Sequence, residues 1–212
     1  MARPVLFVLA GVNGAGKSSI GGHLLTRAGA TWFDPDAFAR ELVAATECRQ
    51  DDANAQAWAE SVRRLDDALA RRRHHAFETT LGGRTVADRI LQATRTHDVL
   101  VWFCGLSSPE QHIARVRARV AAGGHDIPDA AIRRRYPRAL LNLVALMPHI
   151  AHLQVYDNSA GVSPGHAVPD PILVLEMHAG RLTWPSADDV RALDRTPAWA
   201  RAVVETALSL SR

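Results

Sequence analysis

The sequence predicts an α/β fold built around a parallel β-sheet. The first observation is that short apolar runs alternate with longer segments of helical periodicity, the order typical of parallel strands connected by helices. The second is that the first apolar run leads directly into a glycine-rich turn followed by another helical pattern. The chain has 212 residues, of which 47% are hydrophobic and 22% charged, which is enough for one sizeable core in an ordinary globular domain.

Each predicted element follows from this alternation. The strands are predicted at residues 4–10, 30–34, 75–79, 98–105 and 152–157. The helices are predicted at about 17–28, 36–46, 53–73, 84–96, 108–122 and 129–147. A loop at 159–170 then leads to a β-hairpin over 171–184 and a closing helix after Pro197. We therefore expect a core at 1–160, with a C-terminal hairpin and helix at 161–212 packed on the same domain.

The glycine-rich turn contains the one lysine of the chain, against 24 arginines. This residue, Lys17, lies in the run Gly11-Val12-Asn13-Gly14-Ala15-Gly16-Lys17-Ser18, which matches the pattern G-x-x-x-x-G-K-[ST] of a phosphate-binding P-loop. Loop amides and the thin lysine side chain contact phosphates in such loops. We predict ATP contacts from Gly11, Asn13, Gly14, Ala15, Gly16, Lys17, Ser18 and Ser19, with the Ser18 hydroxyl as a ligand of Mg²⁺.

Acidic residues end the second and third predicted strands, at the sheet edge where ligands bind in such folds. Asp36 is predicted at or near a helix N-cap, where it could serve as a capping residue. Its place beside the P-loop favours a catalytic role instead, in which its carboxylate accepts the proton of a substrate hydroxyl. For Asp34, capping and a role in the site are evenly balanced. Glu78 is predicted to contact either Mg²⁺ or the substrate, with Thr79 and Thr80 beside it as substrate contacts.

Arginines are concentrated in two predicted helices joined by Gly123-Gly124. Two basic helices joined by a glycine turn, here at about 108–147, are typical of a lid that closes over phosphates. We expect Arg119 and Arg135 to stabilise the transferring phosphoryl group, and the other arginines to form a solvated basic face. Tyr136 is the one aromatic residue within this cluster, which argues against nucleic acid as the partner.

Other features give weaker or negative indications. Asn158, after the last core strand, is predicted either as an adenine-side contact or as a plain turn residue. His149 and His152 are not accompanied by the Cys, Asp or Glu residues of a zinc site, so no zinc site is predicted there. The sequence contains no signal-peptide pattern and no apolar stretch of membrane-spanning length, so we expect a cytoplasmic protein without membrane contact.

Several segments occur in a characteristic order: G-V-N-G-A-G-K-S-S, F-D-P-D-A-F-A-R, F-E-T-T-L, R-V-R-A-R-V-A-A-G-G-H-D-I-P and Y-D-N-S. Together they resemble the zeta-toxin family of small P-loop kinases. The resemblance implies a three-layer sandwich whose five-stranded parallel sheet has the order 2-3-1-4-5. It also implies transfer of the γ-phosphate of ATP to a hydroxyl of a small molecule, such as the amino-sugar nucleotide UDP-N-acetylglucosamine.

Within this resemblance, Lys17 and Ser18 match the phosphate and Mg²⁺ positions, Asp36 the catalytic base and Glu78 the acid that holds the substrate. The resemblance also allows a protein antitoxin as a partner. Three alternatives remain: a kinase of nucleic-acid ends or nucleosides, an NTPase acting on a protein partner, and a non-catalytic nucleotide-binding module. The presence of Lys17, Ser18 and Asp36 together disfavours the last of these.

Overall fold

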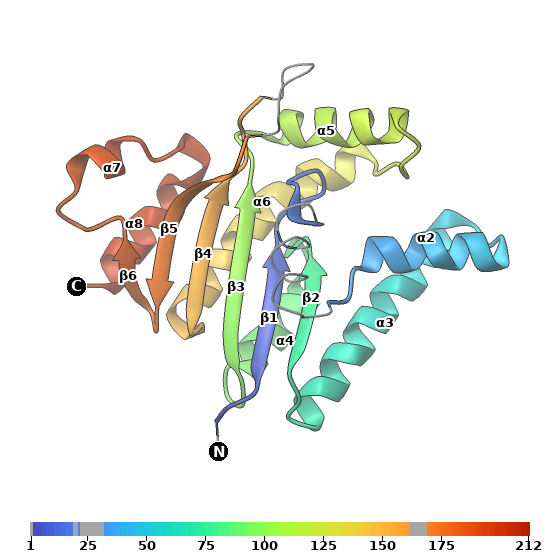
Figure 1. The fold of residues 1–212 in the computed structure, drawn as a ribbon, viewed down its shortest axis with the longest axis horizontal. Helices are drawn as coiled ribbons and strands as arrows, with labels where there is room; N and C mark the ends of the chain where they lie inside the picture. The colour runs from blue at the N-terminus through green and yellow to red at the C-terminus, as the bar shows by residue number, and fades with distance from the viewer. Residues whose placement is uncertain (1, 19–20, 22–31, 162–168) are drawn as a thin grey trace.

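The central element of the fold is a six-stranded sheet, in a computed structural model that describes residues 2–18, 21, 32–161 and 169–212. Its strands, in spatial order, are β2 (His75–Thr79), β1 (Val5–Ala10), β3 (Asp98–Gly105), β4 (His152–Asp157), β5 (Ile172–His178) and β6 (Arg181–Trp184) (Figure 1). The first four strands are parallel, and β5 and β6 pair antiparallel. The predicted α/β fold with a mostly parallel sheet is confirmed.

The prediction of a five-stranded, wholly parallel sheet is wrong. The C-terminal hairpin pairs with β4, so β5 and β6 extend the sheet itself. The strand expected at 30–34 is reduced, within the described residues, to one parallel bridge between Phe33 and Phe77 of β2. This bridge still places Phe33 next to β2, so the predicted order of the core segments holds. The helix expected at about 17–28 lies outside the described residues except for 17, 18 and 21.

The helices have three different positions around the sheet. Helices α4 (Arg84–Ala93), α6 (Asp129–Leu146) and α8 (Arg201–Leu210) lie behind the sheet in Figure 1. Helix α5 (Pro109–Ala121) lies beyond the carboxyl ends of the parallel strands, and α2 (Pro35–Thr46) and α3 (Gln50–Ala70) form a pair beside β2. Short turns complete the chain: η1 (Met147–His149), α7 (Val190–Asp194) and η2 (Ala198–Ala200). Among the described helices, none has the length and apolar character needed to cross a membrane.

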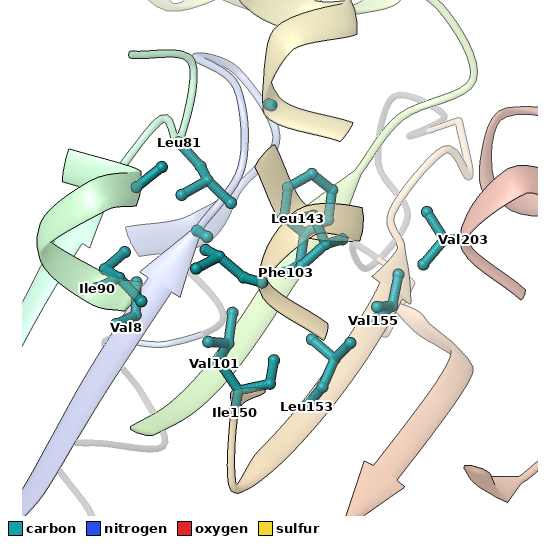
Figure 2. Close-up of a cluster of buried hydrophobic side chains, with 14 of the residues drawn as sticks. Val8, Leu81, Ile90, Val101, Phe103, Leu143, Ile150, Leu153, Val155 and Val203 are labelled. Carbon is teal, nitrogen blue, oxygen red and sulfur yellow. The ribbon is translucent and has the colours of Figure 1, made fainter. Parts of the chain in front are cut away.

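The hydrophobic core lies between the sheet and helices α4, α6 and α8. Alternate residues of the strands face it, because successive side chains of a strand point to opposite faces. Each of the following core side chains is at most 2% exposed: Val8, Val101, Phe103, Leu153 and Val155 from the strands, and Ile90, Leu143 and Val203 from the helices (Figure 2). Helix α6 is therefore part of the core layer, although its residues belong to the segment predicted as a lid at about 108–147.

Helices α2 and α5 begin with the same N-capping arrangement, a capping side chain followed by proline. The Ser108 hydroxyl accepts a hydrogen bond from the amide of Gln111 at the start of α5. At the start of α2, Oδ1 of Asp34 accepts hydrogen bonds from the amides of Asp36 and Ala37, at 2.9 and 3.2 Å. The N-cap of α2 is thus Asp34, and the carboxylate of Asp36 is not used for capping.

Candidate active site

The glycine-rich run follows β1 and lies against α5. Gly14 has a φ of +83°, and a Cβ at this position would lie 2.8 Å from the carbonyl oxygen of His112 in α5. Glycine alone permits both this backbone conformation and this close approach. Two buried side chains hold the loop backbone: His112 Nδ1 donates to the carbonyl oxygen of Asn13, and Asn158 Nδ2 donates to that of Ala15, each at 2.9 Å. The shape of the loop is thus fixed by α5 and by the segment after β4.

Lys17 and Glu78 form a buried ion pair between the loop and the end of β2. Lys17 Nζ lies 3.3 Å from Glu78 Oε1, and the two side chains are 6% and 8% exposed. The Ser18 hydroxyl donates to the other carboxylate oxygen, Glu78 Oε2, at 2.9 Å. Burial raises the pKa of the Glu78 carboxyl above its ordinary value, and the Lys17 ammonium opposes this rise. A hydroxyl beside a carboxylate provides the hard oxygen ligands that suit Mg²⁺.

Asp36 lies at the start of α2 and faces two side chains of the α5–α6 unit. Its Oδ2 is 3.9 Å from Arg119 Nη1 and 3.9 Å from His125 Nε2. The side chain of His125 is 6% exposed, and neither ring nitrogen has a hydrogen-bond partner among the described residues. Burial lowers the pKa of His125, while Asp36 acts in the opposite direction. The Asp36 carboxylate is 35% exposed, so a bound molecule can reach it.

Both arginines predicted to act lie in the site. Arg119, in the last turn of α5, donates from Nη2 to the carbonyl oxygen of His125 at 3.2 Å. Arg135, in α6, donates from Nη1 to Asn13 Oδ1 at 2.7 Å, and burial lowers the pKa of its guanidinium. Gly82 leaves the space for Arg135, because a Cβ at Gly82 would lie 2.8 Å from Arg135 Cγ.

The remaining arginines of the α5–α6 unit have different partners. Arg117 and Arg133 form exposed ion pairs that connect the two helices. Arg115 instead donates from Nη2 to the carbonyl oxygens of Asn158 and Ala160, at 2.6 and 3.1 Å. Its guanidinium is therefore held by the segment after β4, and Arg115 also lines the cavity on the phosphate loop. In the sequence, the one indication that Arg115 lies on the same face of the helix as Arg119 was their spacing of four residues.

Two cavities meet at these residues. One, of about 300 Å³, lies on the phosphate loop, and the other, of about 190 Å³, lies between the end of β2, the α2–α3 pair and α6. Asn13, Lys17, Asp34, Asp36 and Glu78 line both of them. The first is otherwise lined by Gly14, Gly16, Ser18, Arg40, Arg115 and Arg119, and the second by Pro35, Asn54, Ala57, Trp58, Ser61, Thr79, Thr80, Val86, Ile127 and Arg135. Groups bound in the two cavities would thus both contact one shared set of side chains.

The structure places most of the predicted site residues in this region. Thr79 and Thr80 line the second cavity, and their hydroxyls accept hydrogen bonds from the amides of Leu81 and Gly82. Their contact with a substrate stays a prediction. The Asn158 side chain is buried against the loop, so its predicted contact with adenine stays a prediction. Ser19 lies outside the described residues.

The contribution of α3 to the site was not predicted from the sequence. Asn54, Trp58 and Ser61 line the second cavity from this helix. Their spacing places them on one helical face, but no motif distinguishes that face from an ordinary surface. His112 was missed for a similar reason, since a histidine within a helix gives no indication that its ring reaches a loop 99 residues earlier in the chain.

This combination of sheet order, phosphate loop and facing charged side chains defines a P-loop kinase-like fold. Residues 6–137 match the AAA domain family AAA_33, and the chain belongs to that family. A comparison with curated proteins gives no match.

Solved structures share the fold at low sequence identity. The complex of AvrRxo1-ORF1 with ORF2, determined with ATP, aligns with a TM-score of 0.62 and 15% identity, over 100% of this chain and 81% of that chain. A kinase described as putative, from Chloroflexus aurantiacus, aligns with a TM-score of 0.52 and 18% identity, over 64% of this chain and 78% of that one. The Pnkp1/Rnl/Hen1 RNA repair complex aligns with a TM-score of 0.51 and 19% identity, over 67% and 46%. At these identities the likeness establishes the fold, and membership of the zeta-toxin family stays a prediction.

Proposed function

We propose that this chain is an ATP-dependent kinase that transfers the γ-phosphate of ATP to a hydroxyl group of a small molecule. The observation that carries the proposal is that the two cavities share lining residues, among them Lys17, Asp36 and Glu78. Hydrolysis of a nucleotide requires the phosphate-loop cavity alone. Transfer to an acceptor requires a second cavity that reaches the same reacting groups.

On the donor side, the loop amides and Lys17 would bind the β- and γ-phosphates. The Ser18 hydroxyl and the Glu78 carboxylate fit Mg²⁺, which supplies neutralisation of phosphate charge when bound. When a nucleotide binds, Lys17 would exchange its contact with Glu78 for a contact with phosphate. The Glu78 carboxylate would then be available to the metal ion or to the acceptor hydroxyl.

In the transfer step, Asp36 would accept the proton of the acceptor hydroxyl. The acceptor oxygen forms a bond to the γ-phosphorus while the bond from that phosphorus to the bridging oxygen of ADP breaks. Negative charge on the transferring group would be balanced by Arg119, which lies beside Asp36, and by Arg135, which lies beside Asn13 of the loop. The products are the phosphorylated acceptor, ADP and a proton held by Asp36.

The acceptor cavity favours a small polar molecule. It has a volume of about 190 Å³ and presents the polar side chains of Asn54, Ser61 and Thr80. Trp58 also lines it and is 54% exposed, so its ring offers a flat apolar surface to a sugar or a base. We propose a hydroxyl compound of this kind as the acceptor. An amino-sugar nucleotide such as UDP-N-acetylglucosamine is the candidate suggested by the family resemblance.

Mass spectrometry tests this proposal directly. The protein is incubated with ATP, Mg²⁺ and a small-metabolite extract, and a species that gains one phosphate is sought; UDP-N-acetylglucosamine and a 5′-hydroxyl oligonucleotide are tested separately. Lys17→Ala and Asp36→Asn serve as matched inactive variants. A phosphorylated small molecule formed by the wild type alone supports the proposal. ADP release at the same rate with and without extract, with no phosphorylated species, would instead establish a hydrolytic NTPase.

The protein antitoxin allowed by the family resemblance stays a separate proposal. The AvrRxo1 structure is a complex of two proteins, which is in keeping with a protein of this fold that binds a partner. Co-purification of a small protein with the chain expressed in its own host, with loss of ATP consumption in the complex, would support it.

A further inference from the structure

Two histidines and a glutamate form a cluster on the sheet face that points away from the core. His152 begins β4, whereas Glu176 and His178 lie at the end of β5. The antiparallel register pairs His152 with His178 and Gln154 with Glu176, so the four side chains share one face. The intervening residues of both strands, including Leu153 and Met177, point into the core. We propose that His152, Glu176 and His178 bind one divalent transition-metal ion of the zinc type.

The geometry of the cluster is close to that of a metal site. One ligand atom from each of the three residues lies within 4.8 Å of the others. His152 Nε2 is 2.9 Å from Glu176 Oε1, and the imidazole rings of His152 and His178 stack with centroids 4.1 Å apart. Around a tetrahedral Zn²⁺ with bonds of about 2.0–2.1 Å, neighbouring ligand atoms lie about 3.4 Å apart. Small side-chain rotations would therefore bring these three groups to an ion.

The chemistry of the ligands selects the class of ion. Two imidazoles and one carboxylate suit Zn²⁺ and its neighbours in the first transition row, whereas Mg²⁺ and Ca²⁺ prefer oxygen ligands. Three protein ligands leave a position for water in a tetrahedral site. The side chains of His152 and Glu176 are 22% and 26% exposed, and His178 is exposed, so an ion can enter from solvent.

Gln154 and Tyr156 form a second layer around the cluster. Gln154 Nε2 donates to Glu176 Oε1 at 2.7 Å, and the Tyr156 hydroxyl donates to Gln154 Oε1 at 2.9 Å. Carboxylates that bind metals are generally oriented by hydrogen bonds of this kind. The carboxylate of Glu176 is thus held in position by residues that continue along β4 on the same face.

The cluster lies at the end of β4 that is distant from the phosphate loop. Asn158, which contacts the loop, directly follows the last residue of β4, while His152 is the first. Five residue steps of a strand span about 17 Å, so the ion would take no part in the proposed phosphate transfer. Because β4 belongs to the parallel core and β5 to the C-terminal hairpin, the ion would connect the hairpin to the core (Figure 1). Binding to the folded state alone would stabilise it.

Metal titration of the full chain tests this inference. After removal of metals by a chelator, Zn²⁺ is titrated by calorimetry with Mg²⁺ in excess, and Co²⁺ is titrated by its visible absorption. We expect one equivalent to bind with a micromolar or lower dissociation constant, and Zn²⁺ to raise the melting temperature. His178→Ala, a change at an exposed residue, should weaken binding by at least about tenfold. His149→Ala, an exposed histidine in η1, is the matched control and should change nothing.

Glu176→Gln provides a second variant that keeps the shape of the side chain but removes its charge. It too should weaken Zn²⁺ binding and remove the thermal shift. Absence of saturable binding below about 1 mM Zn²⁺, or equal binding by the wild type and His178→Ala, would overturn the inference. ATP consumption is measured in parallel, and because the two sites are separate, a failure of either proposal leaves the other unaffected.

Discussion

Lys17 Nζ lies 3.3 Å from Glu78 Oε1, with both side chains more than nine-tenths buried. The loop lysine is therefore paired with the acid at the end of the neighbouring strand. Phosphates of a nucleotide would compete with Glu78 for this ammonium. The pair compensates both buried charges in the free protein, where an isolated charge would be costly.

Replacing Lys17 by methionine should destabilise the protein as well as prevent nucleotide binding. The change leaves the Glu78 carboxylate buried without its cation, and loss of one partner of a buried pair typically costs about 3–5 kcal/mol. In the double variant Lys17→Met/Glu78→Gln, much of the free energy of unfolding should return, while ATP binding stays absent. Urea unfolding and ATP calorimetry measure the two effects separately. Equal stability of Lys17→Met and the wild type would show that the pair contributes nothing to folding.

Asp34 and Asp36 should differ in what they contribute. Asp34→Ala removes the N-cap of α2 and should lower the free energy of unfolding by about 1 kcal/mol. Asp36→Asn should lower kcat roughly 10²–10⁴-fold through loss of the proton acceptor. It should change stability by no more than about 0.5 kcal/mol, because its carboxylate caps nothing and its contacts with Arg119 and His125 are long, at 3.9 Å. Urea unfolding and steady-state kinetics with the identified acceptor test both statements. Full kcat in Asp36→Asn would exclude it as the base.

Gly82→Ala should displace Arg135 and thereby reduce the rate of transfer. The new Cβ would lie 2.8 Å from Arg135 Cγ and 2.9 Å from its Cβ, so the guanidinium could not keep its contact with Asn13. Gly83→Ala is the matched control, since a Cβ at Gly83 has no atom within 4 Å and its backbone is extended. A lower kcat in Gly82→Ala alone, with an intact circular dichroism spectrum, is the expected result. Equal effects of the two variants would indicate a general disturbance of the β2–α4 loop.

The ring of His112 should make stability depend on pH in the acid range. Burial lowers its pKa from 6.5 to about 4, so the folded protein holds the ring neutral and the unfolded chain binds the proton more readily. Its contribution to stability is therefore present above about pH 6.5 and is lost as the pH falls toward 4. At about 1.4 kcal/mol per pKa unit, the loss is on the order of 3 kcal/mol.

His112→Asn isolates this contribution, because the Asn amide does not titrate and still offers a donor for the carbonyl oxygen of Asn13. Urea unfolding of both proteins from pH 4 to pH 7.5 provides the measurement. The difference in the free energy of unfolding between wild type and variant should change across this range. A constant difference would show that His112 does not titrate as its burial indicates.

Much of the fold follows from local patterns. Alternating apolar runs and helical segments predicted the core strands and the helices that cover them, because burial of one face imposes its period on the sequence. Of the strand predicted at 30–34, the described residues 32–34 form one parallel bridge at Phe33, since β-forming composition does not reveal whether a neighbour is within hydrogen-bonding reach. The hairpin was predicted, but its pairing with β4 was not, because register between distant strands leaves no local signal.

The sequence by itself determined the phosphate loop, since its function depends on contiguous residues whose glycines and lysine act within one turn. Tertiary structure decided which side chains face that loop. Arg135 reaches Asn13 across 122 residues, and Ser18 reaches Glu78 across 60. It also brought His152 together with Glu176 and His178, although the sequence indicated no metal ligands near His152. These contacts depend on strand order and register, which the packing of the whole chain fixes and no single segment encodes.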